Sequence, residues 1–592
     1  MQIKVNRNYV WVNIFIDQLA EYGVKYACIS PGSRSTPLTY ALSQNKKIKT
    51  YVIVDERSSG FFALGIAKQS GTPVIVVTTS GTAAAELYPA IVEAYQNRVP
   101  LIICTADRPA YLRNSGANQT INQDNLYRNH IRFFYDTGLP KLDAKKINLL
   151  KKNSLTAFSI SSFINRGPVH INFPFEKPLE PGSYTDIVEE KIISVSLPQT
   201  SLELLEKGTI KFSNNDYNLI TSQIKKDGCN LITVGPGNFS KQFLDLLETF
   251  STKFSIPIFA DSSSGLSFKS KRLQNLIPNF DALIRSESFK KIFSPKINLH
   301  FGRTATSPRL ENFLAETKTK RFVINRFGDM FDSSRKSKVV TANEEEFIQT
   351  LINTESGKEN TSLTTLNRIK EIESEIEKIK ASIFSNSKKL NEPAILIDVL
   401  NCIPPDSNLM IGNSVPIRDL DFFSPAIKKN INVYQNRGAS GIDGITSTAL
   451  GICSSSKNPT YLVTGDLSFY HDINSLLIAK QYDLPLIIIL INNNGGAIFR
   501  FLPIAEHKSV FKKYFLTPTN LSFKKITEAF EIDYRELKSH QDILNHIKVS
   551  SVRKKPVVFE VKTNSEFSLS IRRKYWKKVN RFVDNFSRNY EA

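Results

Sequence analysis

Two polar residues at the ends of neighbouring apolar segments carry the clearest chemical signal in the sequence. Asp466 follows the apolar run 461–464, and Asn493 follows a second apolar run, 486–491. A helix-length segment lies between the two runs, so we expect parallel strands whose carboxyl ends meet at one sheet edge. Carboxylate and amide oxygens at that edge suit Mg²⁺, which takes its other ligands from water or phosphate. With the backbone carbonyl of Gly495 as a third ligand, the segment is interpreted as a metal–diphosphate site.

The residues around Asp466 fit an anion as well as a cation. Gly465 allows a close approach of the backbone to phosphate, and a helix beginning near Leu467 and Ser468 would aim its N–H groups at the anion. The alternative is a strand-end Asp that caps a helix, followed by an unrelated Gly/Asn turn. The strand context and the run of asparagines favour the functional interpretation. The pattern, GD followed later by NN, resembles the thiamine-diphosphate motif.

A second acidic residue, Glu56, lies in the segment VDERSSGFFALGIAKQSG, just after an expected strand and before a helix. Taken alone, it is an acid favoured by the positive end of the helix dipole. Thiamine enzymes, however, need one carboxylate that hydrogen-bonds N1′ of the aminopyrimidine and favours the tautomer that removes the thiazolium C2 proton. Glu56 is our candidate for that acid.

Four arginines lie at the ends of expected strands or in the turns that follow. They occur in the segments ISPGSRSTPLTYAL, TADRPAYLRNSGANQTINQ, IGNSVPIRDLDFF and YQNRGASGIDGITSTALG, and they are Arg34, Arg108, Arg418 and Arg437. Each segment alone is as consistent with loop and cap chemistry as with function. Arginine is suited to planar, bidentate carboxylate binding. Its repeated use here indicates substrates with several carboxylates.

Alternating strand and helix patterns place these residues in three α/β blocks. We expect three doubly wound parallel-sheet domains, at 1–185, 200–355 and 390–570. The expected strands lie at 26–29, 50–54, 74–78, 101–105, 169–173, 230–234, 258–260, 297–301, 321–324, 461–464 and 486–491. The first and third blocks also share a strand–Gly–helix–Pro–strand pattern, which indicates duplicated domains with a cofactor between them.

Two helical segments lie outside this pattern. Residues 366–385 have the apolar spacing of a packed connecting helix, although a mobile linker fits nearly as well. Residues 571–588 interleave basic and aromatic side chains. A solvated helix face is the expectation for this tail, and a membrane-surface contact is the alternative.

Composition limits the class of protein. The chain has 592 residues, of which 41% are hydrophobic, and no apolar run has the length of a membrane span. The N-terminus carries charges within its apolar part and makes a poor signal peptide. The five cysteines are scattered without metal spacing, and Cys28 and Cys104 lie in strand-like runs, so buried free thiols and a cytoplasmic location are expected.

The net charge is +21, from 77 Lys and Arg against 56 Asp and Glu. Such an excess is compatible with a nucleic-acid or membrane-surface partner. The lysines are spread along the chain, however, without zinc-finger spacing or an RNA-binding aromatic motif. We favour a lysine-rich surface around a site for anionic substrates, and expect no nucleic-acid partner.

Together, these motifs resemble those of a known enzyme family. SPGSRSTPL, DERSSGFFALGIAKQSG, TTSGTAAAELYPAIVEA, TADRP, GANQTINQ, GPVHINFPF, NRGASGIDG and NNNGGAIFRFLP occur in the order found in 2-succinyl-5-enolpyruvyl-6-hydroxy-3-cyclohexene-1-carboxylate (SEPHCHC) synthases. These are thiamine-diphosphate enzymes of menaquinone and phylloquinone biosynthesis. The match covers the first and third blocks well and the second only loosely.

The resemblance implies a fold, a reaction and an assembly. The family has pyrimidine-binding, central and diphosphate-binding domains. It uses thiamine diphosphate with Mg²⁺ or Mn²⁺, decarboxylates 2-oxoglutarate and adds the resulting acyl carbanion equivalent to isochorismate. Its members are homodimers or homotetramers with the cofactor at the subunit interface.

The resemblance also assigns residues. Glu56 would activate the cofactor, Asp466, Asn493 and the Gly495 carbonyl would hold the metal, and Ile442 would wedge the cofactor into a bent shape. Arg34, Gln119, Arg418 and Arg437 would act in catalysis. The substrate pocket would be lined by Ser33, Arg34, Arg108, Gln119, Asn413, Ser414, Arg418 and Arg437, with an apolar wall of Ile498, Phe499 and Leu502.

One assignment departs from the family pattern. The segment TSPRL resembles a basic segment in which some members have Lys-Arg, whereas this chain has Pro308-Arg309. Arg309 is expected to keep a substrate contact, and a lysine contact at 308 is absent.

Two alternative functions remain. Thiamine carboligases such as acetolactate synthases use less anionic acceptors, so the arginines argue against them. None of the seven histidines is adjacent to another, unlike the His-His pair of many thiamine-dependent decarboxylases that protonate their intermediate. The other alternative is a non-catalytic basic protein that binds nucleic acid, which would have no need for Glu56, Asp466 and Asn493 together.

Overall fold

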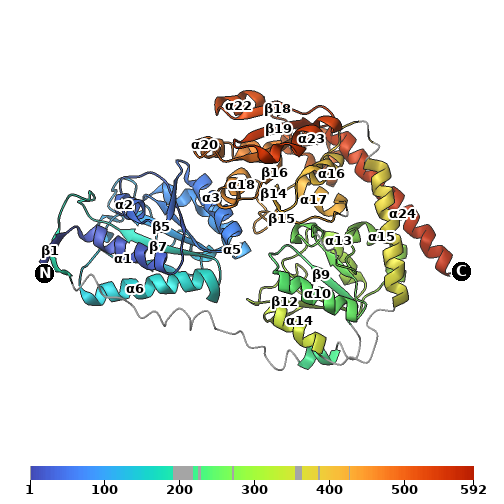
Figure 1. Ribbon diagram of the computed structural model, residues 1–592, viewed down its shortest axis with the longest axis horizontal. Helices are drawn as coiled ribbons and strands as arrows, with labels where there is room; N and C mark the ends of the chain where they lie inside the picture. The colour runs from blue at the N-terminus through green and yellow to red at the C-terminus, as the bar shows by residue number, and fades with distance from the viewer. Residues whose placement is uncertain are drawn as a thin grey trace.

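Parallel β-sheets flanked by helices make up the computed structural model of the chain (Figure 1). The structure describes residues 2–190, 218–223, 229–269, 273–353, 363–384, 387, 389–425 and 427–591. Two expected domain boundaries, 200 and 355, therefore lie outside the described residues, and the domain limits stay predictions.

The first sheet has six parallel strands in the order β3-β2-β4-β5-β7-β6. The inner strands β4, β5 and β7 are buried on both faces, as expected for parallel strands, whereas the edge strands β3 and β6 are partly exposed. Helices α1 (Arg7–Glu21), α2 (Thr36–Gln44) and α6 (Ala144–Ser159) cover one face. The other face is covered by α3 (Glu56–Ser70) and α5 (Tyr88–Asn97). The strands are β2 (Tyr26–Ile29), β3 (Lys49–Val52), β4 (Val74–Thr78), β5 (Leu101–Asp107), β6 (Phe134–Asp136) and β7 (Pro168–Pro174).

The third block has the same strand order, β15-β14-β16-β17-β19-β18. This parallel sheet supports the duplication that the shared sequence pattern indicated. Helices α16 (Glu392–Cys402), α17 (Val415–Phe423) and α23 (His540–Lys548) cover one face, and α18 (Ile445–Ser455) and α20 (Ser475–Gln481) cover the other. The strands are β14 (Ser407–Ile411), β15 (Ile431–Tyr434), β16 (Thr460–Gly465), β17 (Leu486–Asn492), β18 (Asp533–Glu536) and β19 (Val557–Lys562).

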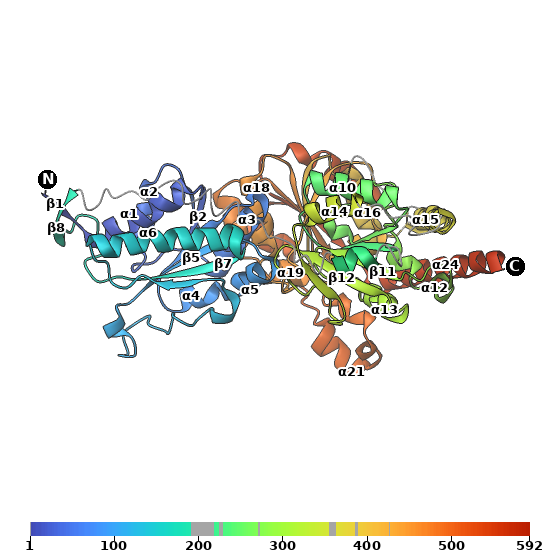
Figure 2. The ribbon, with the colours of Figure 1, turned by 90° about the horizontal axis from the view of Figure 1, so that it is seen from below.

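The two six-stranded sheets share one hydrophobic core, which runs through α3 and α18. Both views place these helices side by side (Figures 1 and 2). The contact requires glycine, because a Cβ atom at Gly65 would lie 2.1 Å from the carbonyl oxygen of Thr448, and one at Gly451 would lie 2.0 Å from that of Phe62. The close approach fixes how the first and third blocks meet.

The central block is a five-stranded parallel sheet in the order β10-β9-β11-β12-β13. Helices α10 (Lys241–Lys253) and α14 (Glu344–Asn353) cover one face, and α11 (Phe280–Leu283), α12 (Glu287–Ile292) and α13 (Pro308–Glu316) the other. Its strands are β9 (Leu231–Val234), β10 (Ile258–Ala260), β11 (Ile297–Phe301), β12 (Lys320–Asn325) and β13 (Lys338–Thr341). The predicted α/β class with three doubly wound parallel sheets is therefore confirmed.

Two long helices, α15 (Leu363–Phe384) and α24 (Ser565–Glu591), pack together at the edge of the molecule (Figure 1). The segment 366–385 is thus a packed helix, apart from Ser385, which lies outside the described residues. The expectation for the basic tail is partly wrong. Arg573, Lys574, Lys577, Lys578 and Arg581 are exposed, but the opposite face of α24 is buried.

A short antiparallel ladder, which the sequence patterns did not predict, joins β1 (Gln2–Val5) to β8 (Asp186–Glu189). In the described part of the chain, no helix combines the length and hydrophobicity of a membrane span. Four of the cysteines, including Cys28 and Cys104, are buried free thiols, and Cys402 is a partly buried one.

Candidate functional site

The carboxyl ends of β16 and β17 lie side by side, because Gly465 pairs with Ile491 in the parallel ladder. Asp466 begins the short helix α19 (Asp466–His471) at this edge and is 1% exposed. Its two carboxylate oxygens accept hydrogen bonds from the backbone N–H groups of Gly495, at 2.8 Å, and Leu467, at 3.0 Å. Burial raises the pKa of the Asp466 carboxyl to about 6, against the opposing effect of these two donors.

Asn493 supplies an oxygen without a partner at the same edge. Its Nδ2 donates to Oε1 of Glu392 at 2.9 Å. Its Oδ1 is buried, yet accepts no hydrogen bond from any described residue. A buried amide oxygen without a donor needs another electropositive partner, and a hard cation provides one. Asp466 and Asn493 therefore fit a Mg²⁺ ion.

The turn between these residues and the following loop depends on glycine. Gly495 has φ +136°, and a Cβ atom there would lie 2.0 Å from the carbonyl oxygen of Leu516. Elsewhere in the described ranges, no group of three or more His, Cys, Asp or Glu side chains is arranged to hold a metal ion.

The loop that contains Ile442 is tied to the same helix. Ser468 Oγ in α19 donates to the carbonyl oxygen of Ile442 at 2.9 Å, while the Ile442 side chain is 37% exposed. Asn413, after β14, holds the loop from the other side: its Nδ2 donates to the carbonyl oxygens of Asn436 and Gly441, both at 2.7 Å. The partly exposed side chain of Ile442 thus lies on a loop that is tied to α19 through Ser468 and to Asn413 through Gly441.

Glu56 is the first residue of α3, capped by Asp55, whose side chain accepts from the backbone N–H of Ser58. Burial raises the pKa of the half-buried Glu56 carboxyl. The neighbouring Arg57 donates to the carbonyl oxygen of His471 at 2.9 Å. The start of α3 therefore docks at the carboxyl end of α19, whereas Asp466 lies at the amino end of that helix.

Two of the predicted arginines come together around the turn after β4. A Cβ atom at Gly32, which precedes Ser33, would lie 2.3 Å from Cβ of Thr79, so the two turns are in close contact. Arg108 donates to Ser80 Oγ at 3.0 Å, and Arg34 donates to the carbonyl oxygen of Phe175 at 2.9 Å. Burial, and next the charge of Arg108, lower the pKa of Arg34, which indicates two guanidinium groups close to each other.

Gln119 belongs to this group. It is exposed and has φ +53°. Its backbone would lie 3.3 Å from a Cβ atom at Gly81, which belongs to the turn after β4. Ser33 is also exposed and accepts a hydrogen bond from Thr36 through its carbonyl oxygen. Ser33, Arg34, Arg108 and Gln119 therefore surround one strand-end turn of the first sheet.

A second arginine pair lies in the third block. Arg418 in α17 donates to the carbonyl oxygen of Ser414 at 2.7 Å, and Ser414 begins that helix with φ +72°. Burial, followed by the charge of Arg437, lowers the pKa of Arg418. Two like charges held near each other are stabilised by anions, so each pair of arginines suits a carboxylate.

The remaining predicted residues lie further out. Arg309 is an exposed residue in the first turn of α13, in the central block. Phe499 packs edge-on against Phe515 at 5.6 Å, Ile498 is half-buried, and Leu502 is 49% exposed. The last three form the segment that directly follows the Asn493 turn.

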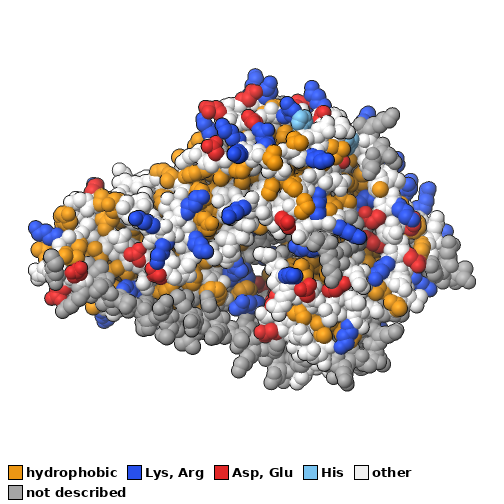
Figure 3. All heavy atoms as spheres, in the orientation of Figure 1, with side chains coloured by type: hydrophobic (Ala, Val, Ile, Leu, Met, Phe, Trp, Pro, Cys, Tyr) orange, Lys and Arg blue, Asp and Glu red, His pale blue; other side chains and the backbone are white. Residues whose placement is uncertain are grey.

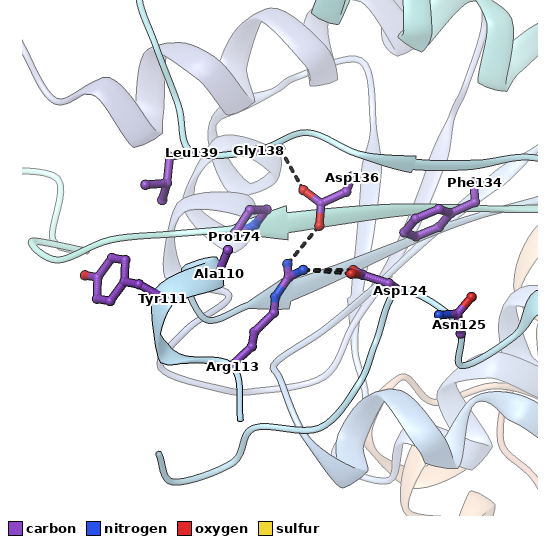
Figure 4. Close-up of a pocket in the computed structure, with 10 residues that line it drawn as sticks. All are labelled: Ala110, Tyr111, Arg113, Asp124, Asn125, Phe134, Asp136, Gly138, Leu139 and Pro174. Carbon is purple, nitrogen blue, oxygen red and sulfur yellow. Dashed lines mark hydrogen bonds and ion pairs between the residues drawn. The ribbon is translucent and has the colours of Figure 1, made fainter. Parts of the chain in front are cut away.

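A cavity of about 370 Å³ lies beside, not within, this set of residues (Figure 4). Arg113 crosses its wall and makes ion pairs with Asp107 at 2.9 Å, and with Asp124 and Asp136 at 2.8 Å each. None of the predicted site residues lines the cavity. Arg113 lies between Arg108 and Gln119 in the chain, so its ion pairs hold the loop that carries them.

Four charged residues that support the site escaped the sequence interpretation. Glu93 and Lys68, in α5 and α3, hold the loop around Arg437; Glu392 and Arg572, in α16 and α24, support Asn493. Lys68 and Glu93 lie within two of the quoted motifs, but in their helical parts and not at the strand-end turns where site residues were sought. Arg572 was interpreted as part of a solvated basic tail, yet it is 2% exposed. The signal that could have identified such residues is a charged side chain at a helix position where the spacing calls for an apolar one.

Comparison with known proteins matches both ends of the chain to thiamine enzymes. Residues 11–126 match the model "Thiamine pyrophosphate enzyme, N-terminal TPP binding domain", and residues 427–561 match the corresponding C-terminal TPP binding domain. The chain is 37% identical to a 2-succinyl-5-enolpyruvyl-6-hydroxy-3-cyclohexene-1-carboxylate synthase of Listeria innocua, over 95% of this chain and 96% of that relative. Proteins of the same name from Oceanobacillus iheyensis and Haloquadratum walsbyi are each 34% identical, over 96% and 98% of this chain and 97% and 99% of the relatives.

Proposed function

The chain belongs to the SEPHCHC synthase family, and on this basis we propose that it decarboxylates 2-oxoglutarate and adds the product to isochorismate in quinone biosynthesis. The resemblance drawn from the motifs is thereby confirmed, and the chain is a thiamine-diphosphate enzyme. The observation that carries the proposal is the pairing of a buried carboxylate, Asp466, with the partnerless amide oxygen of Asn493 at one strand edge.

Asp466, Asn493 and the Gly495 carbonyl would hold Mg²⁺, or Mn²⁺, which in turn would bind the diphosphate. The fit rests on the donor set: three hard oxygens, one of them charged. Gly465, Leu467 and Ser468, at the amino end of α19, would face the phosphates, although a helix of this length adds only its own first N–H groups. Ile442 would press on the cofactor from the loop attached to Ser468.

The bound cofactor supplies the carbanion chemistry that joins a decarboxylated 2-oxo acid to its acceptor. The role of Glu56 is to hold a proton between its carboxyl and the aminopyrimidine ring of the cofactor. Burial favours the protonated carboxyl, since it raises the pKa. A carboxyl whose pKa is raised in this way is better able to donate that proton and to retrieve it.

The two arginine pairs support the choice of substrates. Isochorismate and 2-oxoglutarate are both dicarboxylates, and each pair, Arg34 with Arg108 and Arg418 with Arg437, comes from segments that contact each other at one sheet edge. Gln119, Asn413, Ser33 and Ser414 add neutral hydrogen-bonding groups around the carboxylates, and Arg309 would add a contact from the central block. Ile498, Phe499 and Leu502 would shield the reacting carbons from water.

A second copy of the chain would complete the site. In one chain, the start of α3 with Glu56 docks at the carboxyl end of α19, away from Asp466 at the amino end. Because the family resemblance implies a cofactor at the subunit interface, we propose a homodimer, or a homotetramer built from dimers. The free, mostly buried cysteines support a cytoplasmic location.

The competing function is a carboligase that takes a smaller 2-oxo acid such as pyruvate. We expect kcat/KM for 2-oxoglutarate to exceed that for pyruvate by about 10- to 100-fold, because pyruvate leaves an arginine site unpaired. The measurement is CO₂ release from each acid with thiamine diphosphate and Mg²⁺ present, with a chelated sample as control. Equal or better use of pyruvate would overturn the substrate assignment.

A further inference from the structure

A buried ion network joins the C-terminal helix to the third sheet. Arg572, in α24, is 2% exposed. Its guanidinium donates to Asp419 in α17, at 2.8 Å from Nε, and to Glu392 at the start of α16, at 2.5 Å from Nη2. Glu392 and Asp419 are themselves 1% and 2% exposed. One cation between two carboxylates thus holds three helices together away from water.

Glu392 connects this network to Asn493. Its Oε2 accepts from Arg572, while its Oε1 accepts from Asn493 Nδ2 at 2.9 Å and from Thr563 Oγ1 at 3.3 Å. An ionised carboxylate accepts hydrogen bonds and cannot donate them. The amide of Asn493 must therefore turn its nitrogen towards Glu392, and its oxygen is directed to the opposite side.

The direction of that oxygen matters for a cation. A flipped amide would place Oδ1 against a carboxylate oxygen and would put the NH₂ group where Oδ1 now lies, so that it would repel a metal ion there. In the observed orientation, Oδ1 is buried and has no donor among the described residues. In this orientation Asn493 Oδ1 is available as a ligand atom. It is also a buried polar atom that a cation or a water molecule would satisfy.

We propose that Glu392, held by Arg572, is a positioning residue that fixes the amide of Asn493 with its oxygen directed at the metal. This inference rests on the proposed metal site. A purely structural role is the alternative, since buried ion pairs also anchor helices. Asp419 separates the two, because it pairs with the same arginine and is equally buried, but makes no described hydrogen bond to Asn493.

The test compares Glu392→Gln with Asp419→Asn in the full chain. Mg²⁺ is titrated into each variant at a fixed, saturating concentration of thiamine diphosphate, and the dissociation constant is taken from the change in protein fluorescence. A glutamine can donate to Asn493 Oδ1 and so permits the flipped amide. We expect Glu392→Gln to weaken Mg²⁺ binding by about 10- to 100-fold, the usual cost of losing the support of a metal ligand, and Asp419→Asn to change it less than threefold.

Rescue and controls make the outcomes distinct. In Glu392→Gln/Asn493→Asp, a carboxylate presents one oxygen to the metal whichever way it turns, so Mg²⁺ affinity should recover at least tenfold. Equal losses in Glu392→Gln and Asp419→Asn, or no recovery in the double variant, would overturn the positioning role. If Asp466→Ala also leaves Mg²⁺ affinity unchanged, the metal site itself fails. Should Glu392→Gln not fold, Glu392→Asp, which keeps the charge but shortens the reach, takes its place with the same outcomes.

Discussion

Glu56 and the metal-site residues perform different tasks, and their separate positions allow these tasks to be tested separately. Glu56 begins α3 and lies beside Arg57, whereas Asp466 begins α19 and is bound by the N–H of Gly495. In the proposed site, Glu56 would hold a proton and Asp466 would supply negative charge for the cation. Loss of the Glu56 carboxyl should therefore impair turnover, while cation binding by Asp466 is retained.

Glu56→Gln keeps the size of the side chain but removes the exchangeable proton. We expect kcat to fall by about 10²- to 10⁴-fold, the usual contribution of a general acid or base, while the dissociation constant of thiamine diphosphate changes little. Steady-state kinetics and a cofactor titration on the same preparation measure the two quantities. Retention of wild-type kcat would remove Glu56 from the mechanism.

At this scale the sequence indicated the candidate ligand residues more readily than the residues that support them. Asp466, Asn493 and Gly495 occur in a short motif at strand ends, where parallel-sheet geometry alone brings them together. Glu392 and Arg572 could not be found in this way. They are far apart in the chain, and only the packing of α24 against α16 and α17 makes them partners.

At the scale of the elements, residues of α3 and α5, in the first block, bind the loop of the third block that contains Arg437. Glu93 accepts from the backbone N–H groups of Gly438, at 3.0 Å, and Ala439, at 2.7 Å. Lys68 lies 3.7 Å from Glu93 and donates to Asn436 Oδ1 at 2.7 Å. Burial lowers the pKa of Lys68 to about 8, against the opposing charge of Glu93. These contacts of Glu93 and Lys68, which we call the Glu93 latch, fix the loop at Arg437, which directly precedes Gly438.

Glu93→Gln should therefore affect both stability and substrate binding. Removing one partner of a buried ion pair costs about 3–5 kcal/mol, and the freed loop should raise KM for the carboxylate substrates. Chemical denaturation and steady-state kinetics measure the two effects. Glu21→Gln, in the exposed Lys47–Glu21 pair, is the matched control and should change stability by less than about 1 kcal/mol. Similar effects of both variants would contradict the latch.

A second contact between elements predicts a pH dependence of stability. His540, in α23, forms an ion pair with Asp398, in α16, at 2.5 Å, and this hydrogen bond raises the pKa of His540 above 6.5. A raised histidine pKa means that folding favours the protonated form. The stabilisation is thus complete below pH 6.5 and disappears as the pH rises through the folded-state value.

His540→Gln should accordingly lower the unfolding free energy by about 1–2 kcal/mol at pH 6 and by much less at pH 9. Urea denaturation of both proteins at the two pH values measures the difference. An equal loss at pH 6 and pH 9 would show that the ion pair contributes through packing and not through charge.

The positions of many strands were predictable, because parallel strands are marked by short apolar runs between helices, whereas the order of the strands within each sheet was not predicted. β2, β4, β10 and β11 have the expected bounds, and β16 and β17 extend them by one residue or two. The β1–β8 ladder was not predictable. Its two short strands have no buried residue, and they pair although most of the first block separates them in the chain. Helix α24 shows the same limit: its buried face depends on what packs against it.

At the scale of the whole molecule, the face shown in Figure 3 carries dispersed positive charge. On the face in Figure 3, Lys and Arg are interspersed with Asp and Glu and do not form one continuous stripe. This distribution suits a site for small anions better than a nucleic-acid track. The shared core of the first and third blocks, through α3 and α18, gives the two sheets of one chain a fixed relation.

The decisive measurement follows both substrates together. The full chain is incubated with thiamine diphosphate, Mg²⁺, 2-oxoglutarate and isochorismate, and the loss of each substrate and the mass of the product are recorded over time. We expect the two substrates to disappear in equal amounts and the product to have their summed mass less that of CO₂. Conversion of 2-oxoglutarate to succinic semialdehyde with isochorismate left intact, or no consumption of either, would contradict the proposed reaction.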